Sequence, residues 1–172
     1  VHAFAMFDYY YSKGGKVFDT AFIYNNGLSD RYLGNWINSR SLSDVVVLGK
    51  GAHTPDCFPE KIKPQIEESL SRGGIDKIDI YCLHRDNLDV PVTEFIDALN
   101  ECKNLGLIDV LGASNWELER FKAANDYADN KGITGFKVLS NNFSLARMIE
   151  PVWPGCISCD EEYLSYLSLI HI

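Results

Sequence analysis

The chain has 172 residues, of which 46% are hydrophobic and 23% charged, and its formal net charge is −8 at pH 7. This composition is typical of a globular protein, and the length suffices for one domain with a sizeable core. The acidic balance disfavours nucleic acid and anionic membrane as main partners, because both require a basic face, and no apolar run approaches the roughly 18 residues of a membrane helix.

The first part of the chain predicts helices that alternate with short apolar strands. A helix is expected over residues 2–13, where aromatic residues recur at helical spacing. The apolar residues that follow predict a strand over 17–19, and Ser29 is expected to cap a second helix. A buried strand is expected over 45–48, and after a proline-marked loop a third helix runs to Arg72.

The same alternation continues through the rest of the chain. A strand is predicted over 78–83, and Pro91 is expected to open the next helix, because proline is favoured in a first helical turn. A further strand is expected over 108–112, followed by a helix that Asn115 caps. The fifth strand is expected over 136–139, so strand and helix recur with a period of about thirty residues.

Apolar strands joined by helices indicate a parallel sheet covered by helices. Two architectures fit: a doubly wound open sheet, or a (β/α)8 TIM barrel. The dinucleotide-binding open sheet usually carries Gly-x-Gly-x-x-Gly after its first strand, and this loop is absent here. The barrel places its chemistry just past the strand ends, where Asp19, Lys50, His84 and Ser114-Asn115 all fall. The pattern therefore favours an α/β barrel.

Five strands are fewer than a barrel needs, since a complete one typically has about 250 residues. We therefore expect residues 1–160 to form an incomplete barrel, about strands 2 to 6 with their helices, and to be inactive in isolation. Residues 161–172 are an uncertain tail. The last six residues, 167–172, back-translate in one frame to a common sequencing adaptor, so we exclude them from functional reasoning.

The five cysteines are odd in number and scattered, which favours a reducing compartment, by default the cytoplasm. Only Cys156-x-x-Cys159 has the spacing of a metal or redox pair. A structural zinc site needs four ligands and no second pair exists, so we interpret this spacing as coincidence. His53 and His84 likewise lack a third ligand with sensible spacing, and we predict no metal site.

Four polar residues at successive strand ends suit one reaction. Tyr24 can donate a proton, and an ammonium within reach, that of Lys50, favours its phenolate form. A buried ammonium is costly unless paired, and Asp19 can pair with it. His84 can donate a second hydrogen bond to the oxygen that is protonated. Together these groups suit protonation of a carbonyl oxygen while hydride reaches its carbon, which requires a nicotinamide cofactor.

These motifs resemble the aldo-keto reductase family in kind and in order. The chain contains FDTA with Tyr24 shortly after it, SLSRGGIDKIDIYCLH with His84 at its end, and GASNW around Asn115. The resemblance covers residue 17 to about residue 156. The segments GKGAH (49–53) and FSLARMIEPVWPGC (143–156) are similar to a bacterial branch of that family.

The resemblance implies a (β/α)8 barrel that binds NADP(H), sometimes NAD(H), across its C-terminal face. It implies a catalytic tetrad with Tyr24 as the acid–base residue and an aldehyde or ketone as the small-molecule substrate. It also implies that Ser114 and Asn115 hold the nicotinamide carboxamide. Where the family has a glutamine after the sixth strand, this chain has Asn142, one methylene shorter, as the expected third contact. The tetrad comprises Asp19, Tyr24, Lys50 and His84.

Two other functions stay open at this point. One is a non-catalytic relative that keeps the barrel and cofactor as a sensor or accessory subunit. The other is a different barrel enzyme in which Lys50 forms a Schiff base. Trp116 follows Asn115 directly and is expected at the rim of the substrate pocket, and Trp153 is a second candidate for that pocket.

Overall fold

The computed structural model describes residues 2–146 and 148–169 and contains one sheet of five parallel strands. The strands lie side by side in chain order, so each helical connection leads to the neighbouring strand. A doubly wound sheet reverses its strand order at a switch point, whereas a barrel adds strands in sequence. The sheet comprises β1 (Val17–Asp19), β2 (Val46–Gly51), β3 (Ile78–Leu83), β4 (Ile108–Ala113) and β5 (Val138–Leu139).

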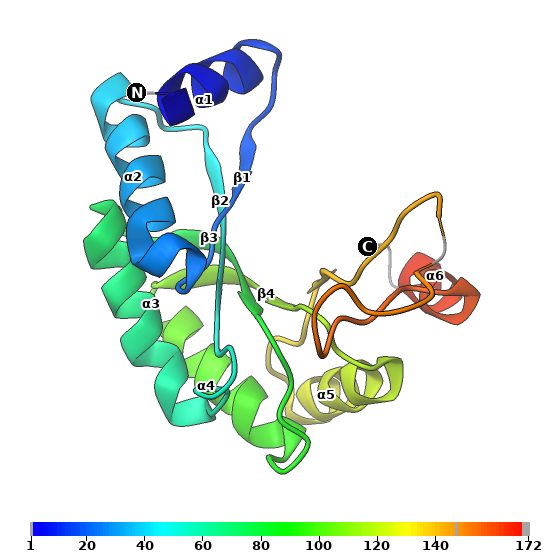
Figure 1. The fold of residues 1–172 in the computed structure, drawn as a ribbon. Coiled ribbons are helices and arrows are strands. Elements are labelled where there is room, and N and C mark those ends of the chain that lie inside the picture. The colour runs from blue at the N-terminus through cyan, green and yellow to red at the C-terminus, as the bar shows by residue number, and fades with distance from the viewer. Residues whose placement is uncertain (1, 147, 170–172) are drawn as a thin grey trace.

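Helices cover the outer face of this curved sheet (Figure 1). Each connection between neighbouring strands carries one α-helix, which is the usual crossover between parallel strands. The arrangement confirms the predicted partial (β/α)8 barrel. The helices are α1 (His2–Ser12), α2 (Leu28–Arg40), α3 (Pro59–Gly73), α4 (Val92–Asn104), α5 (Leu118–Lys131) and α6 (Glu161–Leu169), with a short turn η1 (Tyr24–Gly27) before α2.

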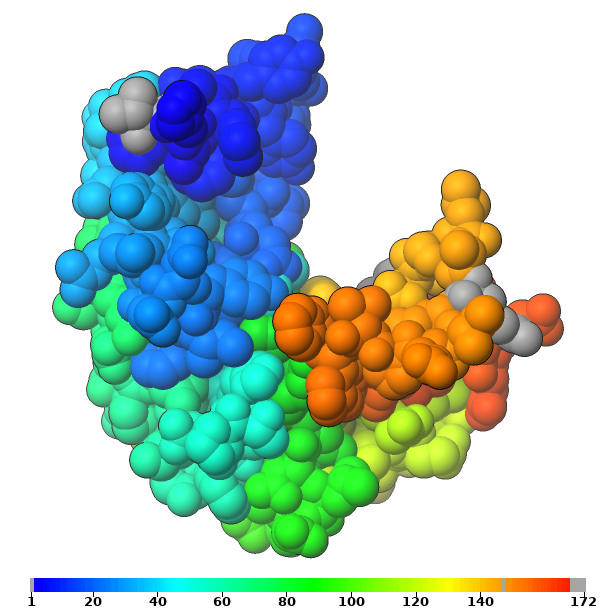
Figure 2. All heavy atoms as spheres, viewed as in Figure 1, coloured from blue at the N-terminus to red at the C-terminus, as the bar shows by residue number. Residues whose placement is uncertain are grey.

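The sheet does not close on itself within the described residues. β1 pairs only with β2, and β5 pairs only with β4. In the space-filling view the molecule is hollowed between the N-terminal elements, in blue, and the segment in orange that follows β5 (Figure 2). The structure is therefore a curled half-barrel whose concave side is open.

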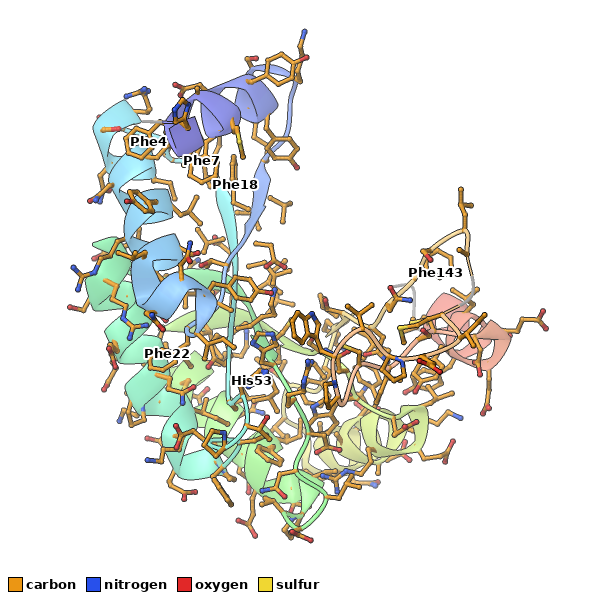
Figure 3. All side chains as sticks on the ribbon, viewed as in Figure 1. Phe4, Phe7, Phe18, Phe22, His53 and Phe143 are labelled. Carbon is orange, nitrogen blue, oxygen red and sulfur yellow. The ribbon has the colours of Figure 1, made fainter. Side chains whose placement is uncertain are left out.

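The core lies between the sheet and its helices and is rich in large aromatic side chains. Phe18 of β1 packs against Trp36 of α2 with ring centroids 4.9 Å apart, and Phe7 of α1 contacts both rings. Phe4, Phe7 and Phe18 gather at the end of the sheet that α1 covers (Figure 3). Aromatic burial at this end stabilises β1, which is only three residues long and has a single neighbour.

Three expectations about local structure were wrong. The helix α2 begins at Leu28, with Gly27 rather than Ser29 at the cap position. Asn115 does not cap α5, because the chain makes a further turn and Glu117 occupies that position. The strand β2 extends to Gly51, so Lys50 lies within the strand and not beyond it. Both caps lie two residues from the predicted position, a shift that is common at helix ends.

The helices α2 and α3 approach each other most closely at a glycine. A Cβ built on Gly34 would lie 1.8 Å from the carbonyl oxygen of Gly73, which is backbone and cannot rotate away. We predict that Gly34→Ala destabilises the fold by about 1–3 kcal/mol through overpacking. Asn35→Ala, on the exposed face of the same helix, should be nearly neutral. Urea denaturation followed by circular dichroism measures both, and equal midpoints for the two variants would disprove this close contact.

Candidate active site

Backbone hydrogen bonds carry the strand pairing one residue past the strand ends. The amide of His84 donates to the carbonyl of Gly51 over 2.6 Å, and that of Ser114 donates to Leu83 over 2.7 Å. The amide of Ser140 donates in the same way to Ala113 over 2.8 Å. This continuous ladder places the residues that follow β3, β4 and β5 at one rim of the sheet.

A cavity of about 690 Å³ opens at this rim. Its size suits a small ligand or part of a cofactor with substrate. It contains six of the seven expected site residues and extends from the loop after β1 to the segment after β5. His53 lies at the rim where β2 ends (Figure 3). The cavity is lined by Asp19, Ile23, Tyr24, Lys50, His53, Thr54, His84, Arg85, Ser114, Asn115, Ser140, Trp153, Pro154 and Cys156.

Lys50 is the most enclosed charge in this cavity, with 5% of its side chain exposed. Its Nζ contacts Oδ1 of Asp19 on the neighbouring strand, and the Asp19 side chain is half exposed. The carboxylate compensates the desolvation of the ammonium, which is costly to bury alone. The Lys50 Nζ also lies 5.2 Å from the centroid of the Tyr24 ring. The predicted pairing of Lys50 with Asp19 is therefore present, and Lys50 adjoins the tyrosine.

Tyr24 is held at the start of a turn with an unusual backbone. Asn25 and Asn26 have φ angles of 51° and 53°, and Gly27 has a φ of 82°. Asparagine and glycine tolerate this left-handed region better than other residues. The turn presents the Tyr24 ring edge-on to the His84 ring, with centroids 5.6 Å apart.

Three side chains fix the loop that carries Tyr24, namely the buried Thr20 and Asp30 and the half-buried Arg72. The Oγ1 of Thr20 donates a hydrogen bond to Oδ1 of Asp30 over 2.7 Å. The Nη1 of Arg72 donates to the carbonyl of Phe22 over 2.8 Å. The guanidinium of Arg72 lies 4.3 Å from the centroid of the Phe22 ring. Arg72 and Asp30 also face each other at 3.7 Å. The loop is thus anchored from α2 and α3 on both sides of the strand exit.

His84 is neutral at ordinary pH in this environment. Burial, and then the electrostatic influence of the neighbouring His53, Lys50 and Arg85, lowers the pKa of His84 to about 3. Its Nδ1 is buried without a hydrogen-bond partner among the described residues. A buried N–H without a partner is costlier than a bare acceptor, so we assign the single proton to Nε2. His84 can therefore donate one hydrogen bond to an oxygen in the cavity.

Ser114 and Asn115 form a polar pair on the cavity wall. The Oγ of Ser114 donates to the carbonyl of Ser140 over 2.9 Å and accepts from Nδ2 of Asn115 over 3.1 Å. The Oδ1 of Asn115 accepts from the amide of Ile157 over 3.1 Å. An amide group has two N–H donors and two acceptor sites, so Asn115 keeps one of each for a ligand.

The structure gives Asn142 no place in the cavity. Its exposed side chain donates to Oγ of Ser158 over 3.1 Å, and its backbone pairs with Ile157 and Cys159. The reason is that β5 has only two residues, after which the chain leaves the sheet. Ser140 lines the cavity instead.

Trp116 also differs from its expected position at the pocket rim. It is fully buried, and its ring contacts Phe95 and Phe136 in the core. Its Nε1 donates to the carbonyl of Arg85 over 3.2 Å. Trp116 therefore supports the wall from behind, whereas Trp153 lines the cavity.

Arg85 is the charged residue of the cavity that sequence reasoning missed. It directly follows His84 where β3 ends, and this position alone was a usable signal. Cys156 also lines the cavity, and its Sγ lies 3.7 Å from Nη2 of Arg85. The neighbours of Arg85 come from a distant part of the chain, so the sequence could not show whether this cation was paired.

Two kinds of feature are absent from the part of the chain that the structure describes. Residues 2–146 and 148–169 contain no cluster of three or more histidine, cysteine or acidic side chains that could bind a metal ion. Among the same residues, no helix combines the length and apolar character that crossing a membrane requires.

The lowered pKa of His84 predicts a pH dependence of stability. Its pKa is about 3 in the fold against 6.5 ordinarily, so the unfolded chain binds the proton more readily between these values. The neutral His84 contributes to the stability of the fold. This contribution is fully present above pH 6.5 and is lost as the pH falls toward 3. When the pH falls from 6.5 to 5, the unfolding free energy of the wild type should therefore drop by up to about 2 kcal/mol more than that of His84→Gln.

Unfolding free energies from urea titrations at these two pH values measure the effect. His2→Gln, which removes an exposed histidine on α1, is the matched control and should lose as much stability as the wild type. Equal losses in wild type and His84→Gln would show that His84 is not held neutral by its surroundings.

Comparison with known proteins agrees with this geometry. Residues 1–152 match the profile of the Aldo/keto reductase family. Norsolorinic acid reductase B from Dothistroma septosporum is 30% identical over 84% of this chain and 40% of its own length. A protein named probable aryl-alcohol dehydrogenase from Saccharomyces cerevisiae is 28% identical over 83% of this chain and 48% of its own. The chain thus spans less than half of these fungal relatives, and the bacterial origin expected from two segments stays a prediction.

Solved structures show the same fold. A glycerol dehydrogenase from Gluconobacter oxydans superposes with a TM-score of 0.62 at 24% identity, over 68% of this chain and 39% of that one. A thermostable aldo-keto reductase solved with the inhibitor epalrestat gives a TM-score of 0.64 at 23% identity, over 72% and 45%. The family profile covers most of the sequence, and the strand order is that of a barrel. The chain belongs to the aldo-keto reductase family.

Proposed function

We propose that this sequence carries the catalytic face of an NADP(H)-dependent reductase of aldehydes or ketones, within a complete eight-stranded barrel. The observation that carries the proposal is the position of Tyr24 between the ion-paired Lys50 and the neutral His84 in one cavity. These are the groups that protonation of a carbonyl oxygen requires. The family and its norsolorinic acid and aryl-alcohol relatives support the carbonyl oxidoreductase class.

The chain's own residues fit a nicotinamide at this site. Asn115 has one donor and one acceptor to spare, which complements the acceptor and donors of a carboxamide. Ser114 fixes the Asn115 amide from one side through its hydroxyl. We assign Ser114 and Asn115 as the residues that bind the carboxamide. We propose Ser140, rather than Asn142, as the third polar residue that lines this subsite.

A nicotinamide held by Ser114 and Asn115 would supply the hydride that the carbonyl carbon of the substrate accepts. The Tyr24 hydroxyl gives its proton to the carbonyl oxygen as the new C–H bond forms. The Nε2–H of His84 donates a hydrogen bond to the same oxygen and orients it. The Lys50 ammonium stabilises the phenolate that remains, and Asp19 holds Lys50 in place and compensates its charge.

The ion pair also bears on the Schiff-base alternative. A lysine amine must be uncharged to attack a carbonyl, whereas a contacting carboxylate favours the ammonium. We therefore rank Schiff-base chemistry at Lys50 below carbonyl reduction. Borohydride trapping of an aldehyde on Lys50 would reverse that ranking. A non-catalytic sensor or accessory subunit would bind NADPH but oxidise none of it with a panel of aldehydes.

The remaining assignments follow from the same proposal. The partner is a small carbonyl compound, and NADP is the preferred cofactor with NAD as the alternative. The five cysteines are free thiols, which accords with the reducing cytoplasm expected from the sequence. Fractionation of the source cells would test this location.

The acid–base role of Tyr24 predicts the effect of removing its hydroxyl. Tyr24→Phe deletes one oxygen and little volume, so fold and NADPH affinity should be retained. Loss of a general acid costs typically about 10²–10⁴-fold, and we expect the upper end of that range. The measurement is single-turnover oxidation of NADPH by benzaldehyde in the complete barrel. Tyr32→Phe, which alters an exposed tyrosine on α2, is the matched control and should retain the full rate.

Lys50→Met should also lose most of the rate, together with some stability, since Asp19 is left without its partner. If Tyr24→Phe kept more than about a tenth of the wild-type rate, the loss would be too small for a general acid. The assignment of the tetrad, and with it carbonyl reduction at this cavity, would then be wrong.

A further inference from the structure

We propose that Arg85 forms an anion-binding subsite, and that the substrates are aldehydes or ketones that carry a carboxylate close to the reacting carbonyl. This inference rests on the proposed reductase function and adds the substrate class to it. Arg85 lines the same cavity as Tyr24 and His84. Its guanidinium offers five N–H donors in a planar fork that matches a carboxylate in geometry.

The polar contacts of Arg85 leave most of this capacity unused. Its Nη1 donates to the carbonyl of His84 over 3.2 Å, and its Nη2 lies 3.7 Å from Sγ of Cys156. A thiol is a weak acceptor, and neither partner carries the negative charge that a guanidinium prefers. No carboxylate of the described residues forms an ion pair with Arg85, so its charge is free for a ligand.

The other half-buried arginines of the described residues, unlike Arg85, form ion pairs with carboxylates. Arg72 pairs with Glu68 over 2.5 Å and faces Asp30, and Arg120 pairs with Asp86 over 2.7 Å. Partial burial of a guanidinium without a carboxylate costs free energy. Arg85 is the exception, and it is the one of these three arginines that lines the candidate active site.

The balance of charges in the cavity also favours an anionic ligand. The charges of Lys50 and Asp19 compensate each other, and the lowered pKa of His84 keeps that imidazole neutral. Arg85 is then an uncompensated positive charge on the cavity wall, in a chain whose net charge is −8. An anionic group that enters the cavity would restore the balance.

Geometry limits the size of such a substrate. Consecutive Cα atoms are about 3.8 Å apart, so Arg85 and His84 start from neighbouring points on the wall. His84 contacts the carbonyl oxygen in the proposed mechanism. Because both side chains line one cavity of about 690 Å³, the anion and the carbonyl belong to one small molecule, for example one with a single aromatic ring between them. Trp153 and Ile23 add apolar surface for such a ring.

A matched pair of aldehydes tests the subsite in the complete barrel. 4-Carboxybenzaldehyde carries the anion, and methyl 4-formylbenzoate has the same skeleton without the charge. We expect Arg85→Met to lower kcat/KM for the carboxylate roughly 10- to 100-fold, mainly through KM, and to change the neutral ester less than about twofold. Arg85→Lys should recover part of the loss. Arg31→Met removes an exposed cation on α2 and should change neither substrate.

Binding without turnover separates this inference from the proposed function. Calorimetric titration with benzoate should show binding to wild type and Arg31→Met, and little or none to Arg85→Met. If wild type reduced neither aldehyde yet bound benzoate through Arg85, the reductase function would fail and the anion subsite would stand. Equal losses on both aldehydes with weaker NADPH binding would assign Arg85 to the cofactor or the fold. That result, or a wild type that neither prefers the carboxylate nor binds benzoate, would overturn the inference.

Discussion

The contact between Lys50 and Asp19 is the interaction on which the candidate site depends. It spans two adjacent strands, β1 and β2, and allows an almost fully enclosed ammonium to remain charged. Without the carboxylate, the ammonium beside Tyr24 would be buried with no compensating charge, which is costly. The same charge contributes to keeping His84 neutral. One ion pair therefore places a compensated positive charge beside Tyr24 in the cavity.

The parallel sheet converts this pair into a site by aligning the strand ends. Hydrogen bonds beyond β3, β4 and β5 keep His84, Ser114 and Ser140 at one level. Past β1, the amides of Thr20 and Phe22 continue the pairing with β2 in the same way. Arg72 and Asp30 anchor this loop further through their side chains. A rigid rim whose Tyr24 loop has this added anchor is a suitable scaffold for the proton donor that we propose.

Much of this arrangement was predictable from periodic patterns. Apolar runs at intervals of about thirty residues predicted the strands and their parallel order, and strand-end positions predicted the cluster of Asp19, Lys50 and His84. Predictions failed where distant segments decide the outcome. Asn142 left the rim because β5 ends after two residues, and Trp116 was buried by aromatic rings from other elements. The unpaired state of Arg85 was likewise invisible, because pairing depends on residues far apart in the chain.

A double-mutant cycle tests the central claim most directly. Single-turnover NADPH oxidation by benzaldehyde would be compared in wild type, Asp19→Asn, Lys50→Met and the double variant of the complete barrel. If Asp19 acts only through Lys50, its substitution slows the wild type but changes the rate of Lys50→Met by less than about twofold. If the two losses multiplied instead, Asp19 and Lys50 would act independently, and the account built on their ion pair would be contradicted.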